Sequence, residues 1–161
     1  MNIGVFLIEC LLLMVIFTFT ILIPLCKNPV WWIHDFPKDI QEEYFKTHER
    51  IPAAPLSKPA LIKKSLVILP IAYLLSWLAR WCGAVSFVQG FLFSYALWLV
   101  LDWYDCFILD WVFFANLKKI RLPGTEHMDQ AYHQKKYHVV HSIVGMVVGV
   151  IPCLLAGLFI R

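Results

Sequence analysis

Long apolar runs alternate with short polar connections along the chain. Four such runs lie at about 3–25, 62–82, 85–117 and 137–160. A helix that crosses the hydrocarbon core needs about 20 residues at about 1.5 Å each, and each run provides at least that. The pattern predicts an all-α, polytopic membrane protein, a four-transmembrane-helix bundle in which residues 1–161 form a single integral membrane domain.

The first and third runs allow more specific expectations. No basic segment precedes the first run and no small-residue cleavage site follows it, so we expect it to be retained as a helix. The third run is longer than one crossing requires. We therefore expect that helix to tilt, or to project into water at the basic end formed by Lys118, Lys119 and Arg121.

The connection between the first and second runs has a pattern of its own. Residues 37–51 read as a short amphipathic helix in which Ile40, Tyr44 and His48 share one face. Such a helix lies in the headgroup region or covers the mouth of the bundle. The prolines of residues 52–59 disfavour helix in the residues before them, so this stretch is expected to run extended.

Basic residues fix the expected orientation. The short second connection contains only Arg80, whereas the first and third connections are rich in Lys and Arg. The basic residues of these two connections are Lys27, Lys38, Lys46, Arg50, Lys58, Lys63 and Lys64 in the first, and Lys118, Lys119, Arg121, Lys135 and Lys136 in the third. The positive-inside rule then places both connections in the cytoplasm and both termini outside.

Composition supports the same class. Hydrophobic residues make up 60% of the chain and charged residues only 16%, too few charges to solvate the surface of a soluble domain. We attribute the net charge of +3 to topology and expect no nucleic-acid partner. The five cysteines are scattered without a C-x-x-C pair, which argues against a disulfide framework or a zinc ribbon.

Acidic and imidazole side chains are arranged about a turn in the second half of the chain. Asp102 and Asp105 precede Leu122-Pro123-Gly124, and His138 and His141 follow it, each pair three residues apart. If both arms are helical and antiparallel, Asp105 lies beside His138 and Asp102 beside His141. The same register sets Asp110 beside His133. Ionisable residues inside a membrane are costly and usually functional.

The last arm shows which of its faces packs inward. At about 100° per residue, His138 and His141 share a sector with Gly145 and Gly149. These glycines form a small-xxx-small pair that lets another helix approach closely, and they also offer a face for a homo-oligomer. Thr125 is expected to cap the start of this arm.

Two carboxylates and two imidazoles that converge between helices can hold a divalent metal. We expect Asp102, Asp105, His138 and His141 to bind iron, manganese or zinc, since mixed oxygen and nitrogen ligands suit these ions. Asp110 and His133 are the candidate acid–base residues. The expected function is a membrane enzyme acting on a lipid-like substrate. Aromatic walls would come from Phe91, Tyr95, Trp98, Trp103 and Phe107, and an anionic headgroup would lie near Lys118, Lys119, Lys135 and Lys136.

Two other functions stay open at this point. The same Asp/His pairs can relay protons or bind a cation in an ion- or proton-coupled transport protein. They can also neutralise each other in a structural or accessory subunit. Glu9, in the first run, is an isolated acidic residue, and His34 and Asp35 lie where they can reach the mouth of the bundle.

Overall fold

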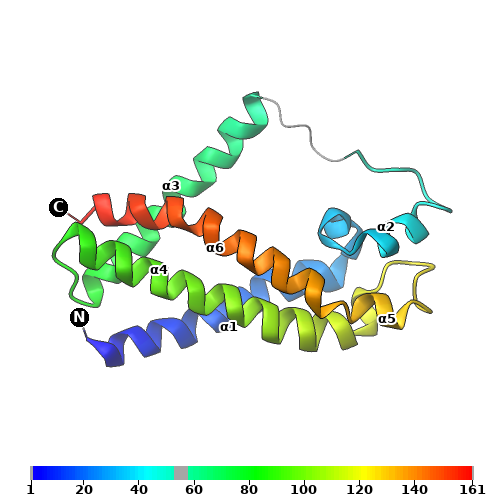
Figure 1. The fold of residues 1–161 in the computed structure, drawn as a ribbon, viewed down its shortest axis with the longest axis horizontal. Helices are drawn as coiled ribbons and strands as arrows, with labels where there is room; N and C mark the ends of the chain where they lie inside the picture. Colours follow the sequence, from blue (N-terminus) through cyan, green and yellow to red (C-terminus); the bar gives the residue numbers. More distant parts are fainter. Residues whose placement is uncertain (1, 53–57, 161) are drawn as a thin grey trace.

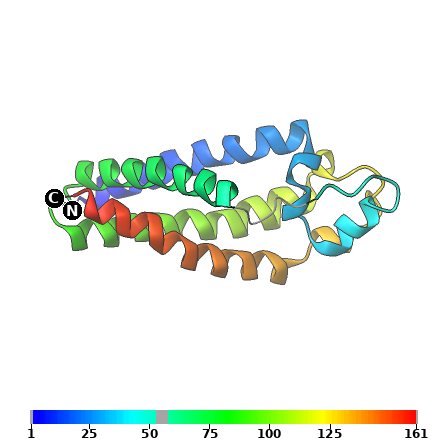
Figure 2. The ribbon, with the colours of Figure 1, turned by 90° about the horizontal axis from the view of Figure 1, so that it is seen from above.

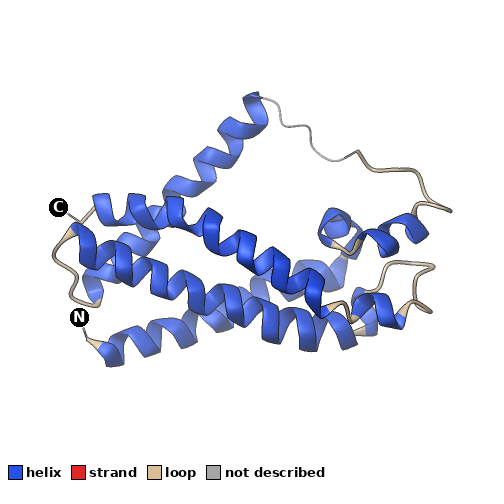
Figure 3. Cartoon of the chain, viewed as in Figure 1, coloured by secondary structure: helices blue, strands red, loops and turns tan. Residues whose placement is uncertain are grey.

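The computed structural model describes residues 2–52 and 58–160, and the regular secondary structure of this part of the chain is all helical, as predicted (Figure 3). The described residues contain six α-helices. Most of the segment expected to run extended, 52–59, lies outside them, but its last two residues are helical and begin α3. The α-helices are α1 (Ile3–Lys27), α2 (Lys38–Tyr44), α3 (Lys58–Trp81), α4 (Phe87–Tyr104), α5 (Asp129–Tyr132) and α6 (Lys135–Leu158). The other helical segments are η1 (Pro29–Asp35), η2 (Asp105–Phe114) and η3 (Lys118–Ile120).

Three of the helical stretches are long and apolar enough to cross a membrane. They are Ile3–Lys27, Phe87–Phe114, which joins α4 to η2, and Asp129–Leu158, which joins α5 to α6. The apolar part of α3, Leu66–Trp81, is shorter than the other three. Three of the predicted runs thus form helices that are candidate membrane spans, while the second predicted run corresponds to a shorter apolar helix.

The long helices α1, α4 and α6 lie side by side, and both termini are at the same end of the bundle (Figures 1 and 2). Helices α1 and α4 run in the same direction, because Phe6 packs on Phe93 while Thr18 hydrogen-bonds to Tyr104 at 2.7 Å. Their outer faces are apolar and exposed, as a lipid-facing surface requires.

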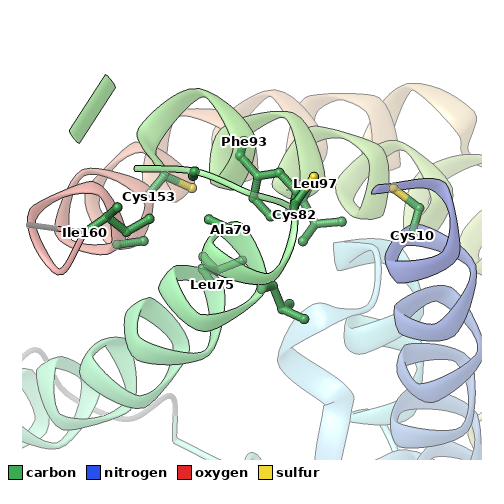
Figure 4. Close-up of a cluster of buried hydrophobic side chains, with 11 residues drawn as sticks. Cys10, Leu75, Ala79, Cys82, Phe93, Leu97, Cys153 and Ile160 are labelled. Atoms are coloured by element: carbon green, nitrogen blue, oxygen red, sulfur yellow. The ribbon is translucent and has the colours of Figure 1, made fainter. Parts of the chain in front are cut away.

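Helix α3 packs on the bundle only through its C-terminal half, and its N-terminal half diverges from it (Figure 1). Its buried residues lie in an apolar cluster with α1, α4 and α6, near the end that carries the termini (Figure 4). This cluster consists of Cys10, Leu75, Leu78, Ala79, Cys82, Ala84, Phe93, Leu97, Cys153, Ala156 and Ile160. It is the packed core of that half of the bundle.

The glycine face of α6 is occupied by α4. A methyl group on Gly145 would collide with the carboxylate of Asp102, and one on Gly149 would collide with the Trp98 indole. Trp98 Nε1 also donates to the Gly145 carbonyl at 3.1 Å. The predicted close approach is therefore made within the chain, and the homo-oligomer proposed for this face would have to displace α4.

A second apolar cluster caps the opposite end of the bundle. Phe36, Ile40 and Tyr44, from the first connection, pack with Tyr132 and with residues around η2 and η3. Ile40 and Tyr44 face inward as expected, but the regular helix ends at Tyr44 rather than near residue 51. Beyond Tyr44, the His48 ring stacks on the Tyr44 ring with centroids 4.0 Å apart, whereas Ile51 is exposed.

The turn after η3 forms where it was predicted, but the following arm begins differently. Gly124 has a positive φ of 83°, a conformation that glycine adopts without steric cost. Thr125 does not cap a helix: its hydroxyl is buried and contacts the Leu122 carbonyl and the Tyr132 hydroxyl. The chain then passes through α5 before α6 starts at Lys135. These turns shift the register between the two arms.

Candidate functional site

The segment that continues α4 is a π-helix, η2, in which backbone hydrogen bonds span five residues. The Ala115 N–H, for example, donates to the Asp110 carbonyl. In an α-helix at about 100° per residue, Asp105 and Asp110 would point about 140° apart. The wider π turn aligns residues five apart, so both carboxylates face the same cavity. The prediction of a regular helix over 85–117 is wrong here, and Asp110 gains a central position.

A cavity of about 240 Å³ lies between this π-helix, α1, η1 and α6. Its polar lining includes three carboxylates and two imidazoles. The full lining is Ile21, Leu25, Trp32, Asp35, Phe36, Asp105, Asp110, Phe114, Tyr137, His138 and His141. The aromatic walls expected from Phe91, Tyr95, Trp98, Trp103 and Phe107 are not part of it. The cavity thus combines apolar walls with ionisable groups.

A direct contact between two ionisable side chains of the cavity joins Asp110 and His138. His138 Nδ1–H donates to Asp110 Oδ2 at 2.9 Å, with side-chain exposures of 7% and 25%. The edge of the imidazole packs on Phe114, with ring centroids 5.3 Å apart. His138 Nε2 is buried and has no hydrogen-bond partner among the described residues. A carboxylate on Nδ1 fixes this tautomer, so Nε2 carries a lone pair that can accept a proton.

His141 and Tyr137, two further polar residues of the cavity, are held by main-chain contacts. His141 Nδ1–H donates to the Tyr137 carbonyl at 3.0 Å, which leaves Nε2 as its basic nitrogen. The Tyr137 hydroxyl donates to the carbonyls of Asp35 and Phe36, both at 3.2 Å. These contacts attach the first connection to the start of α6. The sequence interpretation did not include Tyr137, although its position four residues before His141 puts it on the same helix face.

Asp35 lies at the exposed side of this cavity. Removal of water by the surrounding chain raises the pKa of its carboxyl above the ordinary value, while His141 and His34 act in the opposite direction. The net upward direction means that desolvation outweighs the two imidazoles. Asp35 therefore lines the cavity, and its expected place at the cytoplasmic mouth of the bundle stays a prediction.

Asp102 occupies a different place from the one expected. It lies one helical turn further from the cavity, against Gly145 rather than His141, and its Oδ2 is buried without a partner in the described chain. His138, in turn, pairs with Asp110 and not with Asp105. The expected register is therefore wrong by about one helical turn, because the π-helix and the turns before α6 alter the path between the arms.

The six predicted site residues are thus divided between three places. Asp105, Asp110, His138 and His141 line the cavity, Asp102 lies between α4 and α6, and His133 is exposed. His133 Nδ1 donates to the Asp129 carbonyl at 2.8 Å, although its ring borders a narrow crevice with Asp110 and His138. Over residues 2–52 and 58–160, no three His, Cys, Asp or Glu side chains converge closely enough to hold a metal ion.

A wider groove of about 490 Å³ adjoins the cavity and shares Tyr137 and His141 with it. Lys135 and Lys136 contribute basic groups to this groove, and Lys135 Nζ lies 4.8 Å from the centre of the Trp111 ring. An anionic group could therefore be bound beside the carboxylate-lined cavity.

Comparison with known proteins yields no relative from which a role could be transferred. The chain matches no protein-family model, and no curated protein or solved structure is significantly similar to it. The structure itself shows a small helical protein with helices that are long and apolar enough to cross a membrane.

Proposed function

We propose that the chain crosses the bilayer four times, with η1, α2 and α5 at the cytoplasmic face and both termini outside. The common end of the two termini supports this arrangement (Figure 1). So does the concentration of Lys and Arg in the connections at the other end. Helix α3 has 24 residues, about 36 Å at 1.5 Å per residue, long enough to cross despite its shorter apolar part.

Cysteine accessibility tests this topology. Val85→Cys and Lys119→Cys place thiols at exposed positions on opposite ends of the bundle. In a background with the partly buried Cys26 replaced by Ser, an impermeant maleimide added to intact cells should label V85C and spare K119C. Both should react after permeabilisation. Labelling of K119C in intact cells would contradict the proposed orientation.

We further propose that the protein is an acid–base enzyme for an amphipathic, lipid-like substrate. The single observation that carries this proposal is the buried His138 imidazole, whose Nδ1–H is held by Asp110 and whose Nε2 is free to accept a proton. Nε2 takes a proton from the polar group of the substrate, and Asp110 stabilises the resulting imidazolium. The same proton returns to the product when the imidazolium acts as the acid.

The rest of the cavity fits this substrate class. Ile21, Leu25 and Phe114 provide apolar walls for a hydrocarbon portion, while the basic groove of Lys135 and Lys136 provides a place for an anionic headgroup. A substrate that enters from the bilayer would then place its polar atoms at the Asp110–His138 pair.

Co-purified amphiphiles provide the test. Lipids extracted from detergent-purified wild type, His138→Gln, Asp110→Asn and His133→Gln proteins are compared by mass spectrometry. We expect a bound species whose amount or substrate-to-product ratio changes in H138Q and D110N but not in H133Q, because His133 is exposed and bonded to the main chain. Identical bound species in all four proteins would contradict the proposal.

A divalent metal is a second candidate ligand of the same cavity. Three carboxylates and His141, with Nε2 as its basic nitrogen, line one space of about 240 Å³, and iron, manganese or zinc accepts such donors. Side chains would have to rotate to converge on the ion. Stoichiometric metal in the purified wild type, and its loss in His141→Ala, would support the metal site. A purified protein without metal, whose Tm does not change when divalent ions are added, would exclude the metal site.

A further inference from the structure

Glu9 is an acidic residue buried in the half of the bundle opposite the Asp/His cavity. It lies 16 residues before the cavity residue Leu25 on α1, about 24 Å along the helix axis. Its exposed fraction is 2%. A carboxyl group this deep in an apolar helix requires a compensating partner or a proton.

The described residues provide no such partner. Both carboxyl oxygens of Glu9 are buried, and neither has a hydrogen-bond partner in that part of the chain. The neighbours of Glu9 on α1, Phe6, Cys10 and Leu13, belong to the apolar cluster of Figure 4 or pack against it. Glu9 therefore lies on the face of α1 that packs on α4.

No cation within this cluster can balance a Glu9 carboxylate. The titratable groups in or against the described cluster are Cys10, Tyr95 and Cys153, from α1, α4 and α6, and Cys82, which follows α3; none of them is basic. At the end of α3, Arg80 is exposed, and its guanidinium donates to the Phe159 carbonyl. Among the described residues, none of the groups in this cluster therefore favours the charged form of Glu9.

An ionised carboxylate in apolar surroundings costs far more free energy than a neutral acid, so such a group takes up a proton. We propose that Glu9 is an intramembrane proton-binding site, occupied at neutral pH and separate from the Asp110–His138 pair. Its proton keeps α1 packed on α4. Loss of the proton introduces a charge into the cluster and loosens that end of the bundle.

A lipophilic carbodiimide tests for a protonated acid in an apolar site. The Glu9 carboxyl adds across one C=N bond of N,N′-dicyclohexylcarbodiimide: its oxygen bonds to carbon and its proton moves to nitrogen. Rearrangement then gives a stable N-acylurea. The full-length protein in lipid nanodiscs should gain one reagent mass at Glu9, with labelling that declines as pH rises. Glu9→Gln should remove this adduct. The exposed Glu42 should react with a water-soluble carbodiimide instead.

Two results would overturn the proposal. One is a Glu9 that the lipophilic reagent leaves unmodified at every pH between about 6 and 9, a range that brackets neutrality. The other comes from thermal unfolding. Because E9Q is a neutral isostere, wild type should lose several degrees of Tm relative to E9Q as pH rises, and parallel pH profiles would contradict a proton site. The labelling of wild type stands even if E9Q folds poorly.

Discussion

Substitution of Asp110 by Asn tests whether the Asp110–His138 contact contributes to the stability of the bundle. The 2.9 Å hydrogen bond is assisted by the carboxylate charge, and such bonds contribute about 1.5–3 kcal/mol against about 1 kcal/mol for a neutral pair. Asp110 is one quarter exposed, so water compensates part of the loss. We therefore expect D110N to lower the free energy of unfolding by about 1–2 kcal/mol.

His138→Gln should cost more, about 3 kcal/mol, because it leaves the Asp110 carboxylate without its partner and removes the ring that packs on Phe114. In the double variant the carboxylate is absent as well. Its destabilisation should then fall short of the sum of the single effects by about 1–2 kcal/mol, the coupling energy of the pair.

Reversible unfolding in mixed micelles, followed by tryptophan fluorescence, measures the free energy of unfolding of wild type, D110N, H138Q and the double variant. His133→Gln is the matched control and should stay within about 0.5 kcal/mol of wild type, because His133 is exposed. A coupling energy below about 0.5 kcal/mol would refute the reasoning, since independent sites add within that margin.

Two further substitutions examine the packing and the pH response of the same bundle. Gly149→Ala should lower the free energy of unfolding by about 1–3 kcal/mol, because the added methyl group overlaps the Trp98 indole. The control Val148→Ala, at an exposed position, should have little effect in the same unfolding assay. Equal stabilities of the two variants would contradict the α4–α6 contact. The pKa of Asp35 is raised in the folded protein, so protonated Asp35 stabilises the fold and this contribution is lost as pH rises. The Tm of Asp35→Asn should therefore equal the Tm of wild type below about pH 4 and exceed it at neutral pH. A lower Tm for D35N at neutral pH would show that the carboxylate has favourable partners.

The hydrophobic pattern predicts much of the fold, because lipid-facing and buried faces both require apolar side chains. The runs around α1, α4 and α6 correspond to long apolar helices, and Ile40 and Tyr44 pack inward as their spacing indicates. Gly124 takes the positive φ that its turn requires. Each of these features depends on local sequence, which is why the sequence alone suffices for them.

The register of the site depends on features that the pattern does not encode. An α-helix and a π-helix over Asp105–Phe114 contain the same residues and differ only in their backbone hydrogen bonds. The positions of Asp102 and Asp110 relative to α6 follow from that difference and from the turns between Phe114 and Lys135. Tertiary packing, including the Thr125–Tyr132 contact, decides those turns. The sequence therefore predicts which residue types meet, but not which pairs.

The π-helix itself connects the fold to the proposed chemistry. Such helices are rare, mostly short, and frequently found at functional sites. An α-helical continuation of α4 would turn Asp110 away from Asp105 and leave the buried His138 without its carboxylate. The wider turn instead brings both carboxylates to the cavity while the helix still continues to Phe114. In the proposed function, this backbone geometry serves to place Asp110 on His138 Nδ1, which leaves Nε2 free for the substrate.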